Sequence, residues 1–264
     1  MAEVVQNGVV NLVKAAQVAR ETAVRRAPNG VAYAAFGDNP LTDNDLERLV
    51  QAVPTAIAAA LARKAYYFVP LAISERRAGE SSDATLVAPA YTTELGDQAI
   101  CHRNVTLDNA EGVFISTRLL GDRFALAFEF FINVGHAFVD VAGVPEAFEQ
   151  LAWSHALSDV RGETSHDAWE ARHLSLAGDR SSARSQGKPI VDERSKTSFL
   201  SSAFSDAIAI YLLSLSIDFD YTELREREYP LLAPQPLADR LRLIAKLFPP
   251  NPGYEFAIKY RRRA

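Results

Sequence analysis

The chain has 264 residues, of which 48% are hydrophobic and 23% are charged, and its formal net charge is −5. This composition is that of a globular protein and excludes the collagen-like and disordered classes. Because contact with a phosphate backbone needs a basic face, the charge argues against a nucleic acid as partner. The one basic cluster, residues 261–263, is interpreted as a solvated tail, with docking to an acidic partner as the alternative.

The compartment is indicated by the cysteine content and by the N-terminal sequence. Cys101 is the single cysteine, so no disulfide can form within the chain, and a cytoplasmic location is the simplest interpretation. We interpret Cys101 as a packed small side chain. The first residues lack the pattern of a secretory signal. Polar side chains interrupt the most apolar stretch, 124–141, so we expect no membrane span.

The first part of the chain should be helical. Apolar residues at helical spacing predict a helix over 4–24, and a short strand is expected at 31–36. A capping box that begins at Thr42 predicts a second helix. That helix should run to about residue 64, with a bend or a split at Pro54.

A change of pattern then predicts a sheet. Short segments rich in β-branched or aromatic residues predict strands over 65–73, 84–91, 98–104 and 112–119. The connectors are too short for crossover helices, so three or four of these segments should form a small antiparallel sheet.

From residue 121 the sequence is mainly helical. Asp122 is a plausible N-cap for a long apolar helix. The predicted helices are 123–141, 146–160, 167–174, 198–217 and 237–248, and the polar stretch 178–196 predicts a loop. The fold class is therefore α+β, with a small antiparallel sheet before a mainly helical C-terminal half. We expect an N-terminal helical segment over 1–64 and a second lobe over 65–264, or one continuous domain.

Four polar side chains interrupt the apolar helix 123–141. Glu129, Asn133, His136 and Asp140 follow one another at spacings of four, three and four, which places them on one face. A helix that is apolar nearly all round belongs inside a protein. We therefore expect at least Asn133 and His136 to be buried and hydrogen-bonded.

The following helix carries a second polar pair, His155 and Asp159, four residues apart. A tight turn should make the two helices antiparallel, which would bring His155 near His136 and Asp159 near Glu129. Histidines and carboxylates between helices have the composition of a metal site, with His136, Asp140, His155 and Asp159 as candidate ligands. The alternative is a buried hydrogen-bond network or the polar lining of a cleft.

Asp206 is the one charged residue within 199–217. A buried carboxylate needs a partner, so a network with His136 is one hypothesis and a solvent-facing stripe is the other. Two Glu-x-x-His sequences begin at Glu163 and Glu170, a spacing that di-iron carboxylate proteins use. Because both lie in one polar stretch, we interpret them as a solvated segment or the edge of a cleft.

The segment 133–140, Asn-Val-Gly-His-Ala-Phe-Val-Asp, follows the predicted sheet. It resembles the active-site helix of zinc metallopeptidases that carry His-Glu-x-Gly-His, the lethal-factor-like gluzincins. The segment 204–212 is similar to the second helix of that family. The resemblance covers about 65–217 and implies a zincin-like fold.

The same resemblance places the family's functional residues on this sequence. The first zinc-binding His falls on Ile132 and the general-base Glu on Asn133, whereas Gly135 and His136 match. The third-ligand Glu falls on Ser202. Zinc hydrolases need about three protein ligands and a base, and neither an aliphatic side chain nor an amide can supply them. The resemblance thus implies a pseudo-peptidase.

Three hypotheses follow. The first is a catalytically inactive metallopeptidase-like scaffold that binds a protein partner or belongs to a larger assembly, with no cofactor expected. In the resemblance that implies this scaffold, a further Glu of the family falls on Asp206. The second is a metal-dependent or acid/base enzyme that uses the His and carboxylate cluster, with zinc or another divalent metal. The third is a structural protein with a polar core. The sequence leaves homo-oligomerisation open.

Overall fold

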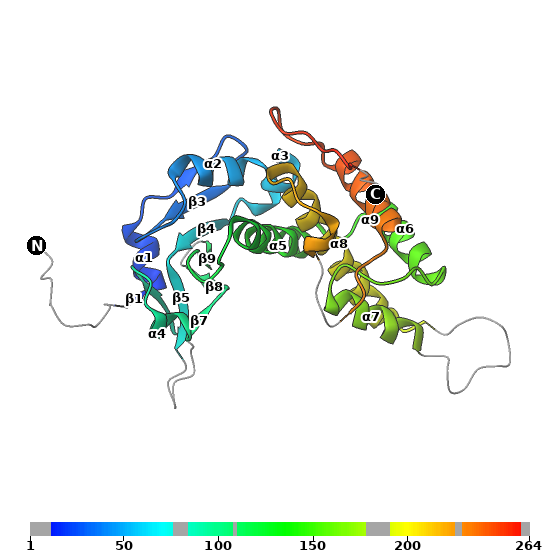
Figure 1. Cartoon of the computed structure of the whole chain (residues 1–264), viewed down its shortest axis with the longest axis horizontal. Helices are drawn as coiled ribbons and strands as arrows, with labels where there is room; N and C mark the ends of the chain where they lie inside the picture. Colours follow the sequence, from blue (N-terminus) through cyan, green and yellow to red (C-terminus); the bar gives the residue numbers. More distant parts are fainter. Residues whose placement is uncertain (1–11, 76–83, 108–109, 178–190, 225–228, 260–264) are drawn as a thin grey trace, which may run out of the picture. The chain divides into compact units, whose positions relative to one another are not determined.

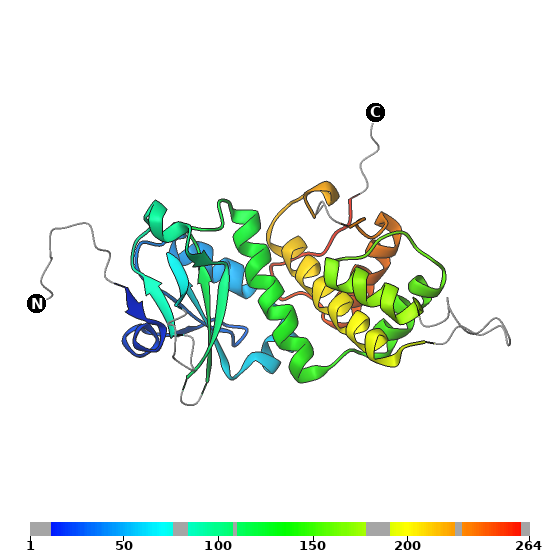
Figure 2. The same ribbon diagram turned by 90° about the horizontal axis from the view of Figure 1, so that it is seen from below.

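A computed structural model describes residues 12–75, 84–107, 110–177, 191–224 and 229–259 (Figures 1 and 2). The chain divides into two compact units. Unit 1 comprises Met1–Gln51 and Ala62–Glu129, and unit 2 comprises Ala52–Leu61 and Phe130–Ala264. The predicted α+β class is confirmed, with a small antiparallel sheet and a helical C-terminal half.

Unit 1 contains both sheets of the described chain. The strands are β1 (Val13–Lys14), β2 (Arg25–Arg26), β3 (Ala32–Ala35), β4 (Lys64–Val69), β5 (Leu71–Glu75), β6 (Ala84–Ala88), β7 (Ala99–Ile100), β8 (His102–Thr106) and β9 (Glu111–Ser116). An antiparallel sheet has the order β1-β6-β5-β7, and a mixed sheet has the order β2-β3-β4-β9-β8.

The mixed sheet departs from the antiparallel pairing that the short connectors predict. β3, β4 and β9 run parallel in it. Helices connect β3 to β4, whereas the connection from β4 to β9 contains the strands β5 to β8 and one short helix. The predicted strand 65–73 is two strands, which separate at Pro70. Proline cannot donate to a ladder, so pairing changes from one sheet to the other at this residue. Tyr67 of β4 stacks on Phe114 of β9 in the core, with ring centroids 4.7 Å apart.

The helices of unit 1 follow their local signals only in part. They are α1 (Ala15–Glu21), α2 (Asp43–Gln51) and α4 (Thr93–Gly96). The helix expected over 4–24 is observed only over the range of α1, because residues 13–14 form β1. Residues 4–11 of the expected helix lie outside the described residues. The capping box is confirmed, because the Asp45 amide donates to Thr42 Oγ1 over 3.1 Å and the Thr42 amide donates to the Asp45 carboxylate. The split at Pro54 is also confirmed, because it separates α2 from α3 (Thr55–Ala58).

Unit 2 is helical among its described residues. Besides α3 and η1 (Ala59–Leu61), the elements are α6 (Glu146–Leu157), α7 (His166–Ala177), α8 (Glu193–Ser216), η2 (Tyr221–Leu224) and α9 (Pro234–Leu247), while α5 (Arg123–Ala142) runs from unit 1 into unit 2. The predicted cap of α5 is confirmed, because the Ala125 amide donates to Asp122 Oδ1 over 2.7 Å. α8 begins five residues earlier than predicted, capped by Asp192. The remainder of the predicted loop, 178–190, and the tail 261–263 lie outside the described residues.

α8 is the central helix of unit 2. α6, α7 and α9 pack against it, and α6 makes its main interhelical contacts with α9 and α8 (Figure 2). α5 and α8 are long and apolar enough to cross a membrane by length and composition alone. A core helix passes the same test, and 72% of the apolar window of α8 is buried.

Candidate functional site

The polar stripe of α5 divides between core and solvent. Asn133 is buried, as predicted, with 7% of its surface exposed. His136 is exposed, so the prediction that it is buried is wrong. Three residues along a helix correspond to a rotation of about 300°, which is enough to carry a side chain off the buried face. Asp140 is exposed because the last turn of α5 leaves the core, where Val141 is 63% exposed.

Glu129 belongs to unit 1, where it has a partner that the stripe did not predict. Its carboxylate oxygen lies 2.5 Å from Nδ1 of His102, the first residue of β8. Cys101 precedes that histidine and is exposed, so it is not the packed side chain that we expected. Partial burial, and then the charge of Glu129, raise the pKa of the Cys101 thiol. A thiol that stays protonated is a poor nucleophile.

Gly135 of α5 lies directly against the backbone of α8 at Ser205. A Cβ atom at this position would lie 2.5 Å from the backbone oxygen of Ser205, a distance that real Cβ atoms essentially never show. Glycine is therefore required for this crossing. The next residue of α8 is Asp206.

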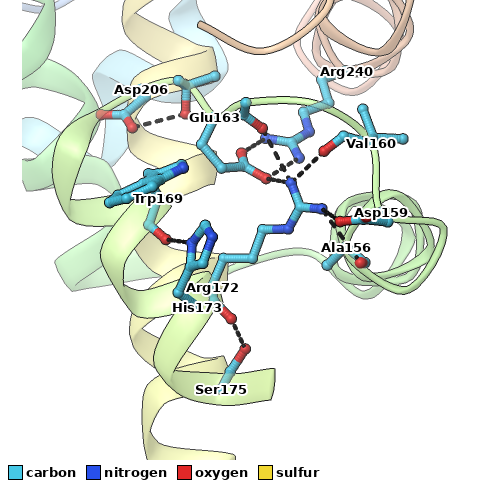
Figure 3. Close-up of polar contacts among 12 residues, drawn as sticks. Ala156, Asp159, Val160, Glu163, Trp169, Arg172, His173, Ser175, Asp206 and Arg240 are labelled. Atoms are coloured by element: carbon cyan, nitrogen blue, oxygen red, sulfur yellow. Dashed lines mark hydrogen bonds and ion pairs between the residues drawn. The ribbon is translucent and has the colours of Figure 1, made fainter. Parts of the chain in front are cut away.

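Asp206 is hydrogen-bonded, as its apolar surroundings predict. Thr164 Oγ1 donates to its carboxylate over 2.9 Å (Figure 3). Burial raises the pKa of Asp206 to about 6, against the hydrogen bonds from Ser165 and Thr164 that lower it. The donors come from the segment before α7, so this contact joins α8 to that segment.

A buried ionic cluster of Glu163, Arg172 and Arg240 lies close to Asp206 in Figure 3. Arg172 Nη1 lies 3.2 Å from one oxygen of Glu163, and Arg240 Nη1 lies 2.8 Å from the other. Glu163 and Arg240 are fully buried, and Arg172 is 5% exposed. The interpretation of the segment from Glu163 as solvated is thus wrong for Glu163, whereas His166, Glu170 and His173 are exposed as expected.

The backbone around Glu163 is also fixed. Its amide donates to Pro230 O over 3.0 Å, and its carbonyl accepts from the Leu232 amide over 2.9 Å. Gly162 has a φ of +80°, and a Cβ there would lie 2.2 Å from Leu231 O. The ionic cluster and this backbone pairing together join α7 to the segment before α9.

His155 and Asp159 border this cluster. Asp159 is exposed, has a φ of 50°, and lies 3.7 Å from Arg172 Nη2. His155 is half-buried, and its pKa is lowered by burial first and then by the charge of Arg240. Among the buried side-chain atoms of the described chain, His155 Nδ1 and Arg240 Nε have no hydrogen-bond partner.

The structure does not assemble the predicted metal ligands. Within the described ranges, no group of three or more His, Cys, Asp or Glu side chains could hold a metal ion. His136 and Asp140 face solvent, whereas His155 and Asp159 lie beside Arg172 and Arg240, whose charges repel a cation.

The sequence reasoning missed Arg172 and Arg240 altogether. A signal was available for Arg240, because Leu237, Leu241 and Ile244 surround it at helical spacing and place it on the apolar face of α9.

No protein-family model matches the chain, and neither does any curated protein sequence.

Proposed function

We propose that the chain is a catalytically inactive, metallopeptidase-like scaffold that acts as a protein-binding or assembly subunit. The crossing of α5 and α8 carries the proposal. Gly135 is the glycine of the His-Glu-x-Gly-His pattern, and its approach to Ser205 gives that match a physical reason. A zincin-like identity is itself part of the proposal.

The residues beside Gly135 support the inactive form of such a scaffold. Ile132 stands at the position of the first zinc ligand and has no lone pair to offer. Asn133 stands at the position of the general base, and its buried amide cannot take a proton from water. Ser202 stands at the third ligand position. A hydrolytic zinc centre needs about three protein ligands and a base.

β8 offers a partner a binding edge. It is the last strand of the mixed sheet within the described ranges. The Ser116 amide donates to Cys101 O over 2.9 Å, and the Leu107 amide donates to Ala110 O over 2.8 Å. Residues of an antiparallel strand alternate in the side to which their backbone groups point. The groups directed at the open edge are therefore those of His102, Asn104 and Thr106. Such an edge is a template for the addition of an extended polypeptide.

The inactive centre is tested with zinc and a peptide substrate. We expect the purified chain to contain no stoichiometric zinc by elemental analysis and to leave casein intact. About one zinc per chain that is lost in His136→Ala, together with casein cleavage, would overturn the proposal.

The binding edge is tested by two substitutions of one exposed residue. Asn104→Pro removes an outward N–H without touching the ladder to β9, and Asn104→Ala keeps it. Peptides selected from a displayed library against the wild type should bind Asn104→Ala equally well and Asn104→Pro at least about tenfold more weakly. Equal binding to all three proteins would place the partner elsewhere.

The acid/base enzyme remains the second candidate because of Asp206. Its pKa of about 6 suits a general acid or base near neutral pH. A screen with ester and amide substrates would favour this candidate if it found an activity that Asp206→Asn abolishes while the fold, monitored by circular dichroism, is retained.

A further inference from the structure

A single asparagine near the end of the described chain holds a segment that precedes it by almost two hundred residues. Asn251 Nδ2 donates to Val53 O over 2.8 Å. Asn251 Oδ1 accepts from the Thr55 amide over 3.0 Å and from the Thr55 hydroxyl over 3.0 Å. The side chain thus bonds on both sides of Pro54, whose own side chain cannot cap α3.

The chain around Asn251 is suited to hold this amide in place. Prolines at 249, 250 and 252 fix three φ angles, and a residue before proline is restricted to extended conformations. A segment with so few conformations loses little entropy when it docks. The Tyr254 amide closes a turn onto Asn251 O over 3.1 Å.

Two contacts with Tyr211 of α8 anchor the same segment. The Tyr211 hydroxyl donates to Phe248 O over 2.7 Å, and the Phe256 ring packs edge-on against the Tyr211 ring with centroids 5.3 Å apart. The chain is therefore tied to α8 at Phe248, just before residues 249–259, and at Phe256 within them, and Asn251 between these two contacts reaches Val53 and Thr55.

Val53 and Thr55, the residues that Asn251 contacts, lie in a short segment of unit 2 that interrupts the sequence of unit 1. Residues Ala52–Leu61 belong to unit 2, whereas Gln51 and Ala62 on either side belong to unit 1. Local hydrogen bonds contribute little to the stability of this segment, because α3 has four residues and η1 has three. Isolated helices of this length are not stable in water.

We propose that residues 249–259 form a clasp, with Asn251 as its closing residue, that controls whether residues 52–61 stay docked in unit 2. When the clasp opens, α3 and η1 undock while the sheets of unit 1 and the helices α6 to α9 remain folded. The clasp is a conformational device of unit 2 and is independent of the proposed function.

Hydrogen exchange on the full chain tests the clasp, with the amides of Thr55, Ile57 and Ala58 as reporters. The first is bonded to Asn251, and the other two donate to Pro54 O. In Asn251→Ala these amides should exchange at least about tenfold faster, because the variant loses three hydrogen bonds. Amides of β4 and β9 should be unchanged.

Two further variants keep the test decisive if Asn251→Ala folds poorly. Asn251→Asp keeps the acceptor for Thr55 and loses the donor to Val53 O, so it should give a smaller acceleration than alanine. Glu255→Ala alters an exposed side chain of the clasp and should change nothing. Unchanged exchange at residues 55–58 in both Asn251 variants, or equal acceleration throughout unit 2, would overturn the proposal.

Discussion

Glu163→Gln should be among the most destabilising single substitutions in unit 2. The change keeps the shape of the side chain and removes one negative charge. Glu163 neutralises two guanidinium groups at 2.8 and 3.2 Å, and none of the three side chains is more than 5% exposed. With glutamine, Arg172 keeps its hydrogen bonds to the carbonyls of Val160 and Gly162, but its carboxylate partner is then the exposed Asp159 at 3.7 Å. Arg240 faces an amide in place of a carboxylate.

The expected loss is set by the charge that stays behind. Removing one member of a buried ion pair typically costs about 3–5 kcal/mol, because the remaining charge is dehydrated without compensation. The amide oxygen can still accept one hydrogen bond, so we expect about 3 kcal/mol. The double variant with Arg240→Met should lose less than the sum of the two single variants, since methionine removes the stranded charge.

Urea unfolding followed by circular dichroism measures these losses. Glu170→Gln, which removes an exposed carboxylate from α7, is the matched control and should change the free energy of unfolding by no more than about 0.5 kcal/mol. If Glu163→Gln unfolded at the urea concentration of the wild type, Glu163 would not be a buried charge and the described cluster would be wrong.

Three further outcomes are expected. The pKa of Asp206 is about 6 in the fold and 3.8 in the unfolded chain, so the folded state binds the proton more tightly. The stability that the protonated Asp206 contributes is therefore present at low pH and is lost as pH rises through about 6. Asp206→Asn should therefore raise the free energy of unfolding by about 1–3 kcal/mol at pH 8 and change it little near pH 3, as thermal unfolding at both pH values would show. Gly135→Ala should cost about 1–3 kcal/mol in urea unfolding because its methyl group meets Ser205 O, whereas Gly121→Ala, which has open space, should be nearly neutral. His136→Ala should shift the unfolding free energy by less than about 0.5 kcal/mol, since the side chain is exposed; a loss of several kcal/mol would contradict that exposure.

Local signals predicted local structure well. The capping box at Thr42, the cap at Asp122 and the break at Pro54 each depend on a few neighbouring residues, and all three are present. The α+β class followed from the change of period along the chain. The parallel pairing of β4 with β9 did not follow from it, because the length of a connector does not show that the strands β5, β6 and β7 within it join another sheet.

The polar sites were harder to predict because their partners are distant in sequence. Glu163 and Arg240 are separated by 77 residues, and periodicity assigns each to a face of its own segment without pairing them. Helical spacing placed Asn133 and His136 on one side of α5 but could not show where the core boundary crosses that side. Burial of a charged residue depends on a partner that a single pattern does not contain.

The separation of 196 residues between Thr55 and Asn251 also bears on biosynthesis. Ribosomes add about 5–20 residues per second, so Thr55 precedes Asn251 by roughly 10–40 s. The strands that pair in the mixed sheet are all made by residue 116, and this sheet can form on the nascent chain. Residues 52–61 must wait for a contact that is translated much later. Throughout that interval the side chains of this segment that are buried in the folded chain, such as Ile57 and Leu61, lack the contacts that Asn251 holds in place.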